Sequence, residues 1–303
     1  MTTTAHRSVA VPARLVVGCG YLGTRVARAW RAAGDRVLAV TRRPERAVEL
    51  AAVGLEPVVA DVTAADHTAW LATLPEVATV FWAVGFDRAS GRSHADVHVH
   101  GLGRLLDALS GRPRIILSSS TGVWGDEAGT IVDEDTPARP AREAGHVLVE
   151  AESLLRSHRL GPGVALRFAG LYGPGRLPRL DALRAGRPIA ADPDSWLNLI
   201  HVDDAARVVL AVAAAPAPAP LYVVSDGRPV RRRDWYGRLA EVTGSPPVTW
   251  DPAAPRTRGA DKRVRSERVW HDLGITPLHP DSIAALPLVA KLPEARGVSR
   301  EGR

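Results

Sequence analysis

The chain has 303 residues, of which 46% are hydrophobic and 24% are charged, and it holds a single cysteine. This composition is ordinary for a globular protein and excludes a disordered or collagen-like chain, while one cysteine excludes an intramolecular disulfide and a cysteine-rich zinc module. No run of 18 apolar residues is present and residues 1–14 hold no apolar core of a signal peptide, so we expect a cytoplasmic protein without a membrane span.

The basic charge is concentrated in the C-terminal quarter of the chain. The formal net charge is +6, and residues 231–303 carry 14 basic and 9 acidic side chains. Such an excess can mark a nucleic-acid surface, but a solvated, arginine-rich surface is the simpler interpretation. We therefore do not expect a nucleic acid as the partner.

Strand-like and helix-like segments alternate along the first 170 residues. Short apolar runs predict strands, and apolar residues at helical spacing predict helices. The predicted strands are 15–17, 36–40, 57–60, 77–82, 114–117 and 164–168. The predicted helices are 21–33, 44–53, 66–73, 93–109 and 140–158. This alternation predicts an α/β fold with a doubly wound parallel sheet of the Rossmann type.

The pattern changes after residue 170. The stretch AAAPAPAP at 213–220 predicts a stiff connector or a linker, followed by a strand at 221–224 and a helix at 233–243. We assign residues 1–168 to the Rossmann domain and 169–295 mainly to a C-terminal substrate lobe with segments that return to the sheet. We expect residues 296–303 to be a disordered tail.

The turn after the first predicted strand carries a glycine motif, GCGYLG at residues 18–23. A G-x-G-x-x-G turn between a strand and a helix lets the backbone approach a pyrophosphate, and the N–H groups of the helix N-terminus face the phosphates. We predict that this turn binds a dinucleotide, although a glycine-rich turn without a ligand is the alternative. The predicted contacts are Gly18, Gly20, Tyr21, Leu22 and Gly23.

The residues after the second predicted strand indicate which dinucleotide is bound. Enzymes that use NAD place an acidic side chain there, on the ribose 2′-hydroxyl. Here the strand ends in Thr41, Arg42 and Arg43, and guanidinium groups suit a 2′-phosphate. We predict NADP in preference to NAD, with Asp61 and Val62 beside the adenine. The two arginines could instead be surface charges, and Asp61 could cap the next helix.

Several later segments resemble the extended short-chain dehydrogenase/reductase superfamily, in its NAD-dependent epimerase/dehydratase group. They are SSSTGVWG at 118–125, LRFAGLYGPG at 166–175, NLIHVDD at 198–204, YVVSD at 222–226, and DKRV at 261–264 with LG at 273–274. The resemblance covers nearly the whole chain. It implies an oxidoreductase, epimerase or dehydratase that acts on a small polar substrate such as a sugar nucleotide, and that could form a homodimer through its fourth and fifth helices.

The sequence departs from this family at the catalytic pair. The family uses a serine or threonine with Tyr-x-x-x-Lys, and Ser120 matches its serine. The stretch EAE at 150–152 resembles the family's LEAE and places Ala144 at the tyrosine position and Leu148 at the lysine position. The chain is therefore similar to the atypical branch that keeps the fold and loses the pair.

Other residues are weaker candidates. His146 could be a general base if the helix register moved by two residues, but that is a rotation of about 200°, and a surface histidine is the simpler interpretation. Ser120 could orient a substrate oxygen or only bond to the backbone at the strand end. The resemblance places Asn198 and His201 at the substrate cleft, where His201 could equally be structural. Anion-binding candidates are Arg142 and Arg176, and we expect no metal site.

Two functions remain open at this point. The first is an NADP(H)-dependent oxidoreductase or epimerase, in which hydride transfer is the chemistry of the cofactor. The second is a sensor or regulatory module that binds NADP(H) without turnover. The missing tyrosine and lysine favour the second function, and the intact glycines and cleft segments favour the first.

Overall fold

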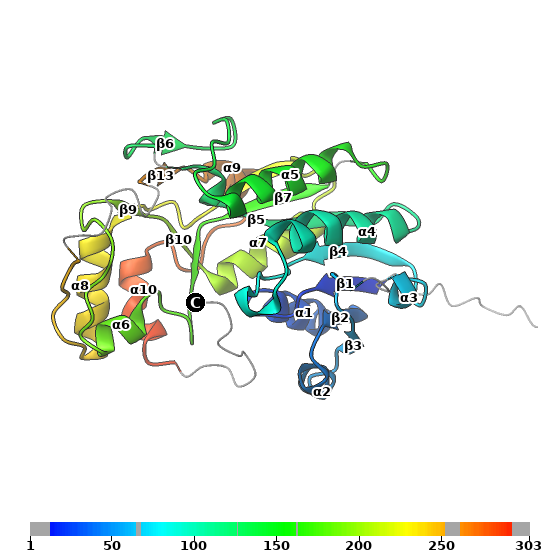
Figure 1. Cartoon of the computed structure of the whole chain (residues 1–303), viewed down its shortest axis with the longest axis horizontal. Helices are drawn as coiled ribbons and strands as arrows, with labels where there is room; N and C mark the ends of the chain where they lie inside the picture. The colour runs from blue at the N-terminus through cyan, green and yellow to red at the C-terminus, as the bar shows by residue number, and fades with distance from the viewer. Residues whose placement is uncertain (1–12, 65–67, 126, 162, 252–260, 293–303) are drawn as a thin grey trace, which may run out of the picture.

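The centre of the molecule is a seven-stranded parallel sheet with the order β11-β7-β5-β4-β1-β2-β3 (Figure 1). The computed structural model describes residues 13–64, 68–125, 127–161, 163–251 and 261–292. The strands are β1 (Ala13–Val17), β2 (Val37–Thr41), β3 (Glu56–Val59), β4 (Val77–Trp82), β5 (Arg114–Ser120), β7 (Val164–Phe168) and β11 (Leu221–Val224). The predicted Rossmann-type α/β fold is confirmed, and the predicted bounds of β4, β7 and β11 coincide with the observed ones.

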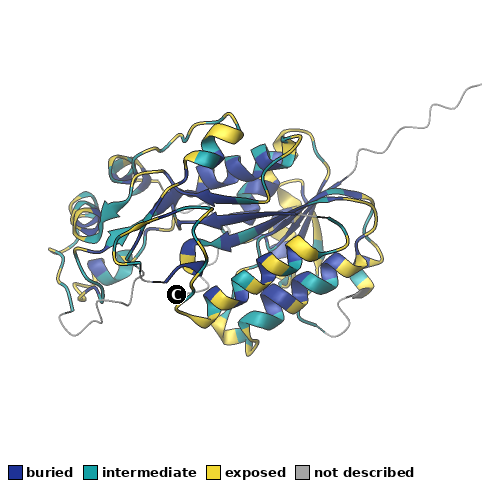
Figure 2. Ribbon diagram, turned by 90° about the horizontal axis from the view of Figure 1, so that it is seen from above, coloured by how far each residue is buried: buried dark blue, intermediate teal, exposed yellow. Residues whose placement is uncertain are grey.

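Helices cover both faces of this sheet because successive strand residues point to opposite sides. Val16 packs with α1 (Gly23–Ala32), α2 (Pro44–Ala52) and α7 (Val202–Ala214), whereas Leu15 and Val17 pack with α3 (Thr68–Leu71), α4 (Gly101–Ala108) and α5 (Glu143–Ser157). Figure 2 shows the buried strands between helices whose outer faces are exposed. The apolar strand runs are therefore explained by burial on both faces.

The helix predicted at 93–109 divides into two parts. A π-helical turn, η2 (Asp96–His100), precedes α4. Gly101 begins α4 where an added Cβ would lie 3.3 Å from the carbonyl oxygens of Asp96 and Val62. The apolar period alone does not separate the two, because a π-turn adds one residue inside a continuous helix. The helix predicted at 66–73 is the shorter α3, and residues 65–67 lie outside the described residues.

A smaller lobe lies at the carboxyl ends of the strands and has a core of its own (Figure 1). Its helices are α6 (Leu180–Arg184), α8 (Arg232–Thr243) and α10 (Ser282–Val289). Its strand pairs are β8 (Gly170–Tyr172) with β10 (Leu199–His201), and β9 (Trp196–Leu197) with β12 (Val230–Arg231). A further pair, β6 (Ile131–Val132) with β13 (Arg263–Val264), and helix α9 (Glu267–Asp272) complete the described elements.

The alanine–proline stretch at 213–220 joins α7 to β11, the outer strand of the main sheet. Chain segments on both sides of it therefore belong to the Rossmann layer. The tail expected at 296–303 lies outside the described residues. Among the described helices, none combines the length and the apolar character that a bilayer crossing requires.

Candidate functional site

A cleft of about 1300 Å³ opens where the carboxyl ends of the strands meet the lobe. One wall consists of the turns that follow β1, β2, β3 and β4, and the other consists of residues between 170 and 188. Open α/β sheets bind their ligands at this edge. The predicted residues in the lining are Gly18, Gly20, Tyr21, Leu22, Thr41, Arg42, Arg43, Asp61, Val62 and Arg176.

The three motif glycines have different roles. Gly18 has φ +98°, and an added Cβ would lie 2.6 Å from the carbonyl oxygen of Ala83. An added Cβ at Gly23 would lie 2.1 Å from the carbonyl oxygen of Gly18, so Gly23 serves helix packing and lies outside the lining. Gly20 has no atom within 4 Å of an added Cβ. The cleft therefore leaves room beside Gly20, where a pyrophosphate would approach the backbone.

Tyr21 connects the glycine turn to the opposite wall. Its hydroxyl donates a hydrogen bond of 3.1 Å to the carbonyl oxygen of Pro174. The guanidinium carbons of Arg25 and Arg176 lie 4.2 and 5.4 Å from the centre of its ring. An added Cβ at Gly173 would lie 2.7 Å from the Tyr21 hydroxyl, so this contact requires glycine there. The two motifs GCGYLG and YGPG therefore meet across the cleft.

Arginine dominates the charge of the cleft. Among the described lining residues there are nine arginines and two aspartates. The lobe wall contributes three arginines and no carboxylate, and one of them, Arg179, has the left-handed φ of +62°. A concave, positively charged surface of this kind attracts an anionic ligand. The arginines are Arg25, Arg42, Arg43, Arg46, Arg88, Arg92, Arg176, Arg179 and Arg187.

Two side chains at the nucleotide end were not found from the sequence. Asp87, in the loop after β4, forms an ion pair with Arg42, and its Oδ1 accepts a 2.8 Å hydrogen bond from the N–H of Ala89. The hydrogen bond from Arg42 is the main reason that the pKa of Asp87 is held below its usual range. Arg46, on α2, is buried and donates 2.9 Å to Thr24 Oγ1. The helical spacing that buries Arg46 was a possible signal, whereas nothing in the sequence joins Asp87 to Arg42.

Asp61, which we predict beside the adenine, has a carboxylate that is already engaged. Its Oδ1 accepts hydrogen bonds of 2.8 Å from the N–H and 2.7 Å from the hydroxyl of Thr63. Burial raises its pKa, but these bonds and the charges of Arg92 and Arg42 together hold it below the ordinary value. The carboxylate caps its own turn and also faces the cleft beside Val62.

At the β5 end, the predicted catalytic residues lie outside the cleft lining. Ser120 Oγ accepts a 3.0 Å hydrogen bond from the N–H of Gly122, and its neighbour Ser118 lines the cleft instead. His146 is exposed on α5. Leu148 packs beside Val123 and Trp124. Leu148, which the predicted register places at the family's lysine position, therefore contributes to packing.

Asn198 also has a structural partner set. Its side-chain amide donates 2.9 Å to the carbonyl oxygen of Lys262 and accepts 2.8 Å from the N–H of Val264. These bonds fix β13 against β9 and β10. Arg142 is exposed at the start of α5, and both residues lie outside the cleft lining.

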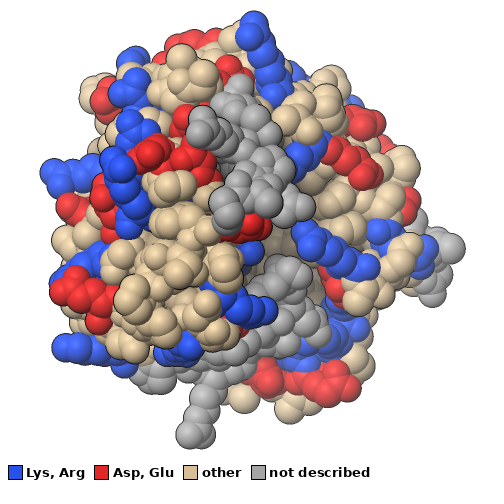
Figure 3. All heavy atoms as spheres, turned by 60° about the vertical axis from the view of Figure 1, so that its left-hand side comes forward, with Lys and Arg blue, Asp and Glu red and all other residues tan. Residues whose placement is uncertain are grey.

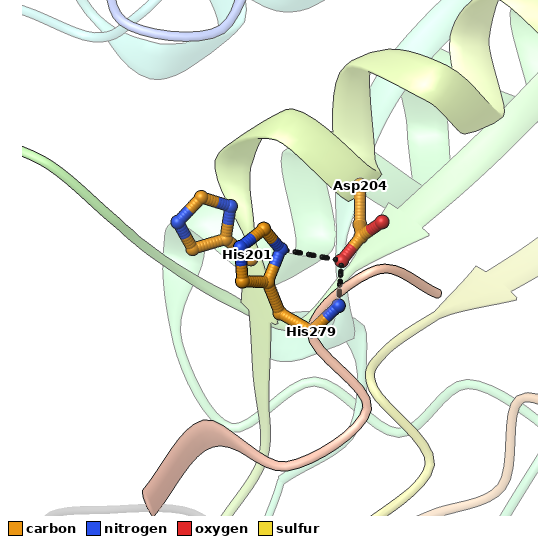
Figure 4. A group of neighbouring side chains, drawn as sticks. All are labelled: His201, Asp204 and His279. Carbon is orange, nitrogen blue, oxygen red and sulfur yellow. Dashed lines mark hydrogen bonds and ion pairs between the residues drawn. The ribbon is translucent and has the colours of Figure 1, made fainter. Parts of the chain in front are cut away.

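His201 belongs to a buried group with Asp204 and His279 (Figure 4). Its ring stacks on that of His279 at 3.7 Å, and its Nδ1 accepts a hydrogen bond from the N–H of Asp203. Burial, and then the charge of His279, lower the pKa of His201 to about 4. The imidazole is therefore neutral at neutral pH and lies outside the cleft lining.

The same three side chains are close enough together to be considered as ligands of a metal ion. Each offers one ligand atom, and these atoms lie within 4.8 Å of one another. However, the two rings are stacked on each other, and Asp204 already accepts from the N–H groups of Leu278 and His279 and interacts with the His279 ring. These hydrogen bonds hold residues 278–279 against the start of α7.

Four of the described arginines near the C-terminus form ion pairs with carboxylates. Arg268 pairs with Glu134 and Asp135, and Arg265 pairs with Asp133. Arg233 and Arg238 have carboxylate partners as well. Figure 3 shows basic and acidic side chains interspersed over the face that carries the lobe. This pattern favours a solvated surface over a nucleic-acid surface.

Comparison with known proteins agrees with this arrangement. Residues 14–224 match the model of the NAD dependent epimerase/dehydratase family. Protein YeeZ of Escherichia coli K12 is 31% identical over 290 residues, which are 90% of this chain and 98% of YeeZ. A putative NAD-dependent epimerase/dehydratase from Methylobacillus flagellatus is 28% identical with a TM-score of 0.72, over 92% of this chain and 97% of that one.

A more distant structure shares the fold. The UDP-glucose 4-epimerase of Thermotoga maritima, solved with UDP-glucose, has a TM-score of 0.78 at 20% identity. The match covers 92% of this chain and 97% of the epimerase. The sheet and the lobe are therefore both part of the shared architecture.

Proposed function

The chain belongs to the NAD-dependent epimerase/dehydratase family, and on that premise we propose that it binds NADP(H) in preference to NAD(H) and acts on a small, polar, anionic substrate. The observation that carries this proposal is the arginine-lined cleft, closed on one side by the glycine turn and on the other by the lobe. A nicotinamide cofactor supplies hydride transfer when it is bound. The reaction would be an oxidation or reduction, an epimerisation or a dehydration.

The cofactor residues follow from the shape and charge of the first wall. The open space beside Gly20 suits a pyrophosphate, and the N–H groups at the start of α1 face it. Arg42 and Arg43 would bind a 2′-phosphate, since guanidinium and phosphate pair through two hydrogen bonds. Asp61 and Val62 would border the adenine.

The substrate residues follow from the second wall. Arg176, Arg179 and Arg187 would hold phosphate or carboxylate groups. A sugar nucleotide has two phosphates, and UDP-glucose is present in the Thermotoga maritima epimerase structure. A sugar-nucleotide-like compound is therefore the substrate class that we propose. Arg142, Asn198 and His201 are less suited, because they lie outside the lining.

The proton of such a reaction needs a carrier other than tyrosine. Ser120 lies outside the described lining, but its hydroxyl hydrogen is not used in the bond that its oxygen accepts from Gly122, so it would be left to orient a substrate oxygen that reaches the end of β5. Ala144 and Leu148 can exchange no proton, and His146 is exposed on the helix. Water would then carry the proton at this end of the cleft.

The alternative is an NADP(H) sensor without turnover. It is favoured by one observation, the packing of Leu148, at the predicted lysine position, against the core cluster that contains Val123 and Trp124. Both functions require the same nucleotide site, and they differ in whether a substrate is converted.

We propose further that the protein is a homodimer and that it is located in the cytoplasm. Contact through α4 and α5 would be polar, because Arg142, His146 and Glu150 are exposed there. Among the described residues, no exposed large apolar side chain lies on those two helices. Light scattering of the purified chain would measure the oligomeric state.

The test is a fluorescence titration of the full chain with NADPH and, separately, with NADH. We expect micromolar binding of NADPH and weaker binding of NADH. Gly20→Ala should abolish binding, whereas Gly237→Ala, which also adds a methyl group to open space, should leave it unchanged. Absence of binding to either nucleotide would contradict the proposal. Oxidation of NADPH on addition of a sugar nucleotide would separate an enzyme from a sensor.

A further inference from the structure

Asp87 brings a carboxylate to a place where the sequence has none. The strand β2 ends at Thr41 and is followed by two arginines. In the sheet, β1 lies between β2 and β4, so the loop after β4 reaches the end of β2 across one strand. Oδ2 of Asp87 forms an ion pair with Nη2 of Arg42, and both residues line the cleft. An acidic side chain at the end of β2 is the feature of NAD sites.

The two partners of this pair are held to different degrees. Asp87 caps the short helix η1 (Arg88–Ser90) through the N–H of Ala89, and its carbonyl oxygen accepts a 2.6 Å hydrogen bond from Ser90. The side chain of Arg42 is 40% exposed, and that of Asp87 is 25% exposed. Water screens such a pair, so a competing anion can take the guanidinium from it. The exposed guanidinium of Arg42 can therefore exchange partners, while the hydrogen bonds of η1 hold Asp87 in place.

The carboxylate also faces the second predicted phosphate ligand. The charges of both Arg42 and Arg43 act on Asp87 and lower its pKa, with the hydrogen bond from Arg42 as the largest cause. One carboxylate thus partly neutralises both cations that the sequence assigns to a 2′-phosphate. A phosphate at this position would be attracted by the two arginines and repelled by the negative charge of Asp87.

We propose that Asp87 is a specificity-determining residue, which competes with the 2′-phosphate of NADP(H) for Arg42. This inference rests on the proposed function. To bind Arg42, the 2′-phosphate of NADP(H) must break the ion pair between Arg42 and Asp87. This cost reduces the affinity advantage of NADP(H) over NAD(H). NAD(H) leaves the pair intact, and Asp87 can accept a hydrogen bond from the ribose 2′-hydroxyl. The wild-type protein therefore uses both nucleotides, with a modest preference for NADP(H).

A neighbouring pair supplies the matched control. Arg46 pairs with Glu49 one turn along α2, and Arg46 lines the cleft whereas Glu49 does not. Glu49→Gln and Asp87→Asn remove the same charge from an arginine partner at the same end of the cleft. Asparagine also keeps the acceptor that caps η1, so Asp87→Asn preserves the loop.

The experiment measures the affinity of the full chain for NADPH and NADH in four variants: Asp87→Asn, Glu49→Gln, Arg42→Ala, and the double change of Asp87 and Arg42. We expect Asp87→Asn to raise the NADPH-to-NADH affinity ratio by about fivefold or more, the size of an ordinary coupling between groups. Glu49→Gln should leave the ratio within about twofold, well below such a coupling. In the absence of Arg42, the effect of Asp87→Asn should disappear.

Three results would overturn the inference. The first is an unchanged ratio in Asp87→Asn. The second is an equal gain in Glu49→Gln, which would indicate general charge instead of the pair. The third is a gain that persists without Arg42. These failures leave wild-type nucleotide binding intact, so they differ from a folded wild type that binds neither nucleotide, which would overturn the proposed function and this inference together.

Discussion

The two ends of the same sheet edge use polar side chains in opposite ways. Beside β1, β2 and β4, arginines and aspartates line an open cleft, and their ion pairs are partly exposed. Beside β5 and β7, Ser119 donates 2.6 Å to Glu152, which forms a buried ion pair of 2.7 Å with Arg167. The first set of side chains faces the cleft, whereas the second set is engaged in buried contacts inside the protein.

This difference indicates that one end is suited to binding a ligand and the other to stabilising the fold. A screened surface pair contributes little to stability and can exchange partners, whereas breaking a buried pair leaves an uncompensated charge. The nucleotide end can therefore carry ligand chemistry. The β5 end, where we predict that the family's tyrosine and lysine are replaced, supports the geometry of the sheet.

The largest expected effect tests the buried end. Arg167→Met should lower the free energy of unfolding by about 3–5 kcal/mol, because Glu152 remains charged and buried. Urea unfolding measures this loss. Arg36→Met breaks an exposed pair with Glu56 and should cost far less. Equal losses in the two variants would remove the distinction between the two ends.

The next effect concerns the glycine turn. Gly23→Ala should lower the free energy of unfolding by about 3 kcal/mol, because the added Cβ would lie 2.1 Å from a backbone oxygen. Gly20→Ala meets no atom and should change stability little while it blocks the nucleotide. Thermal unfolding of both variants checks the division of roles. A comparable loss in Gly20→Ala would show that this glycine also serves packing.

A pH dependence sharpens the description of the buried end. Burial, and then the charge of His94, lower the pKa of His98 on η2 to about 4. The unfolded chain binds the proton more readily, so the stability conferred by the neutral ring is present above pH 6.5 and is lost as the pH falls towards 4. Between pH 7 and pH 4.5, wild type should lose about 2 kcal/mol more than His98→Gln. Parallel urea titrations that show equal losses would contradict a buried neutral imidazole.

The smallest expected effect is at His146. Its side chain is exposed, so His146→Ala should change the free energy of unfolding by no more than about 0.5 kcal/mol and leave nucleotide affinity unaltered. Calorimetry and the NADPH titration check both. Loss of turnover in this variant, once a substrate is known, would restore His146 as a general base.

Local patterns were sufficient for much of the fold. The bounds of β4 and β7 were predicted from largely apolar runs, which burial on both faces of the sheet requires. The division of 93–109 into η2 and α4 was missed, because it depends on how Gly101 packs against the sheet. The helical period of apolar residues indicates which face is buried. It does not distinguish the hydrogen bonding of an α-helix from that of a π-turn.

The same holds for the candidate site. The glycine turn was visible in six consecutive residues, because the phosphate-binding geometry is local. The wall formed by Arg176, Arg179 and Arg187 was only partly visible, since the lobe had to place it opposite the turn. Asn198 was proposed for the cleft through the resemblance, and the structure gives it bonds to Lys262 and Val264.

The sequence by itself determined the fold class and the position of the glycine turn, because each depends on patterns of neighbouring residues. Only the tertiary structure decided which charges face the cleft and which face one another. Arg42 and Asp87 are 45 positions apart, and the sheet order alone brings them together. Electrostatic energy depends on distance in space, so an absent carboxylate after β2 could be replaced by one from β4.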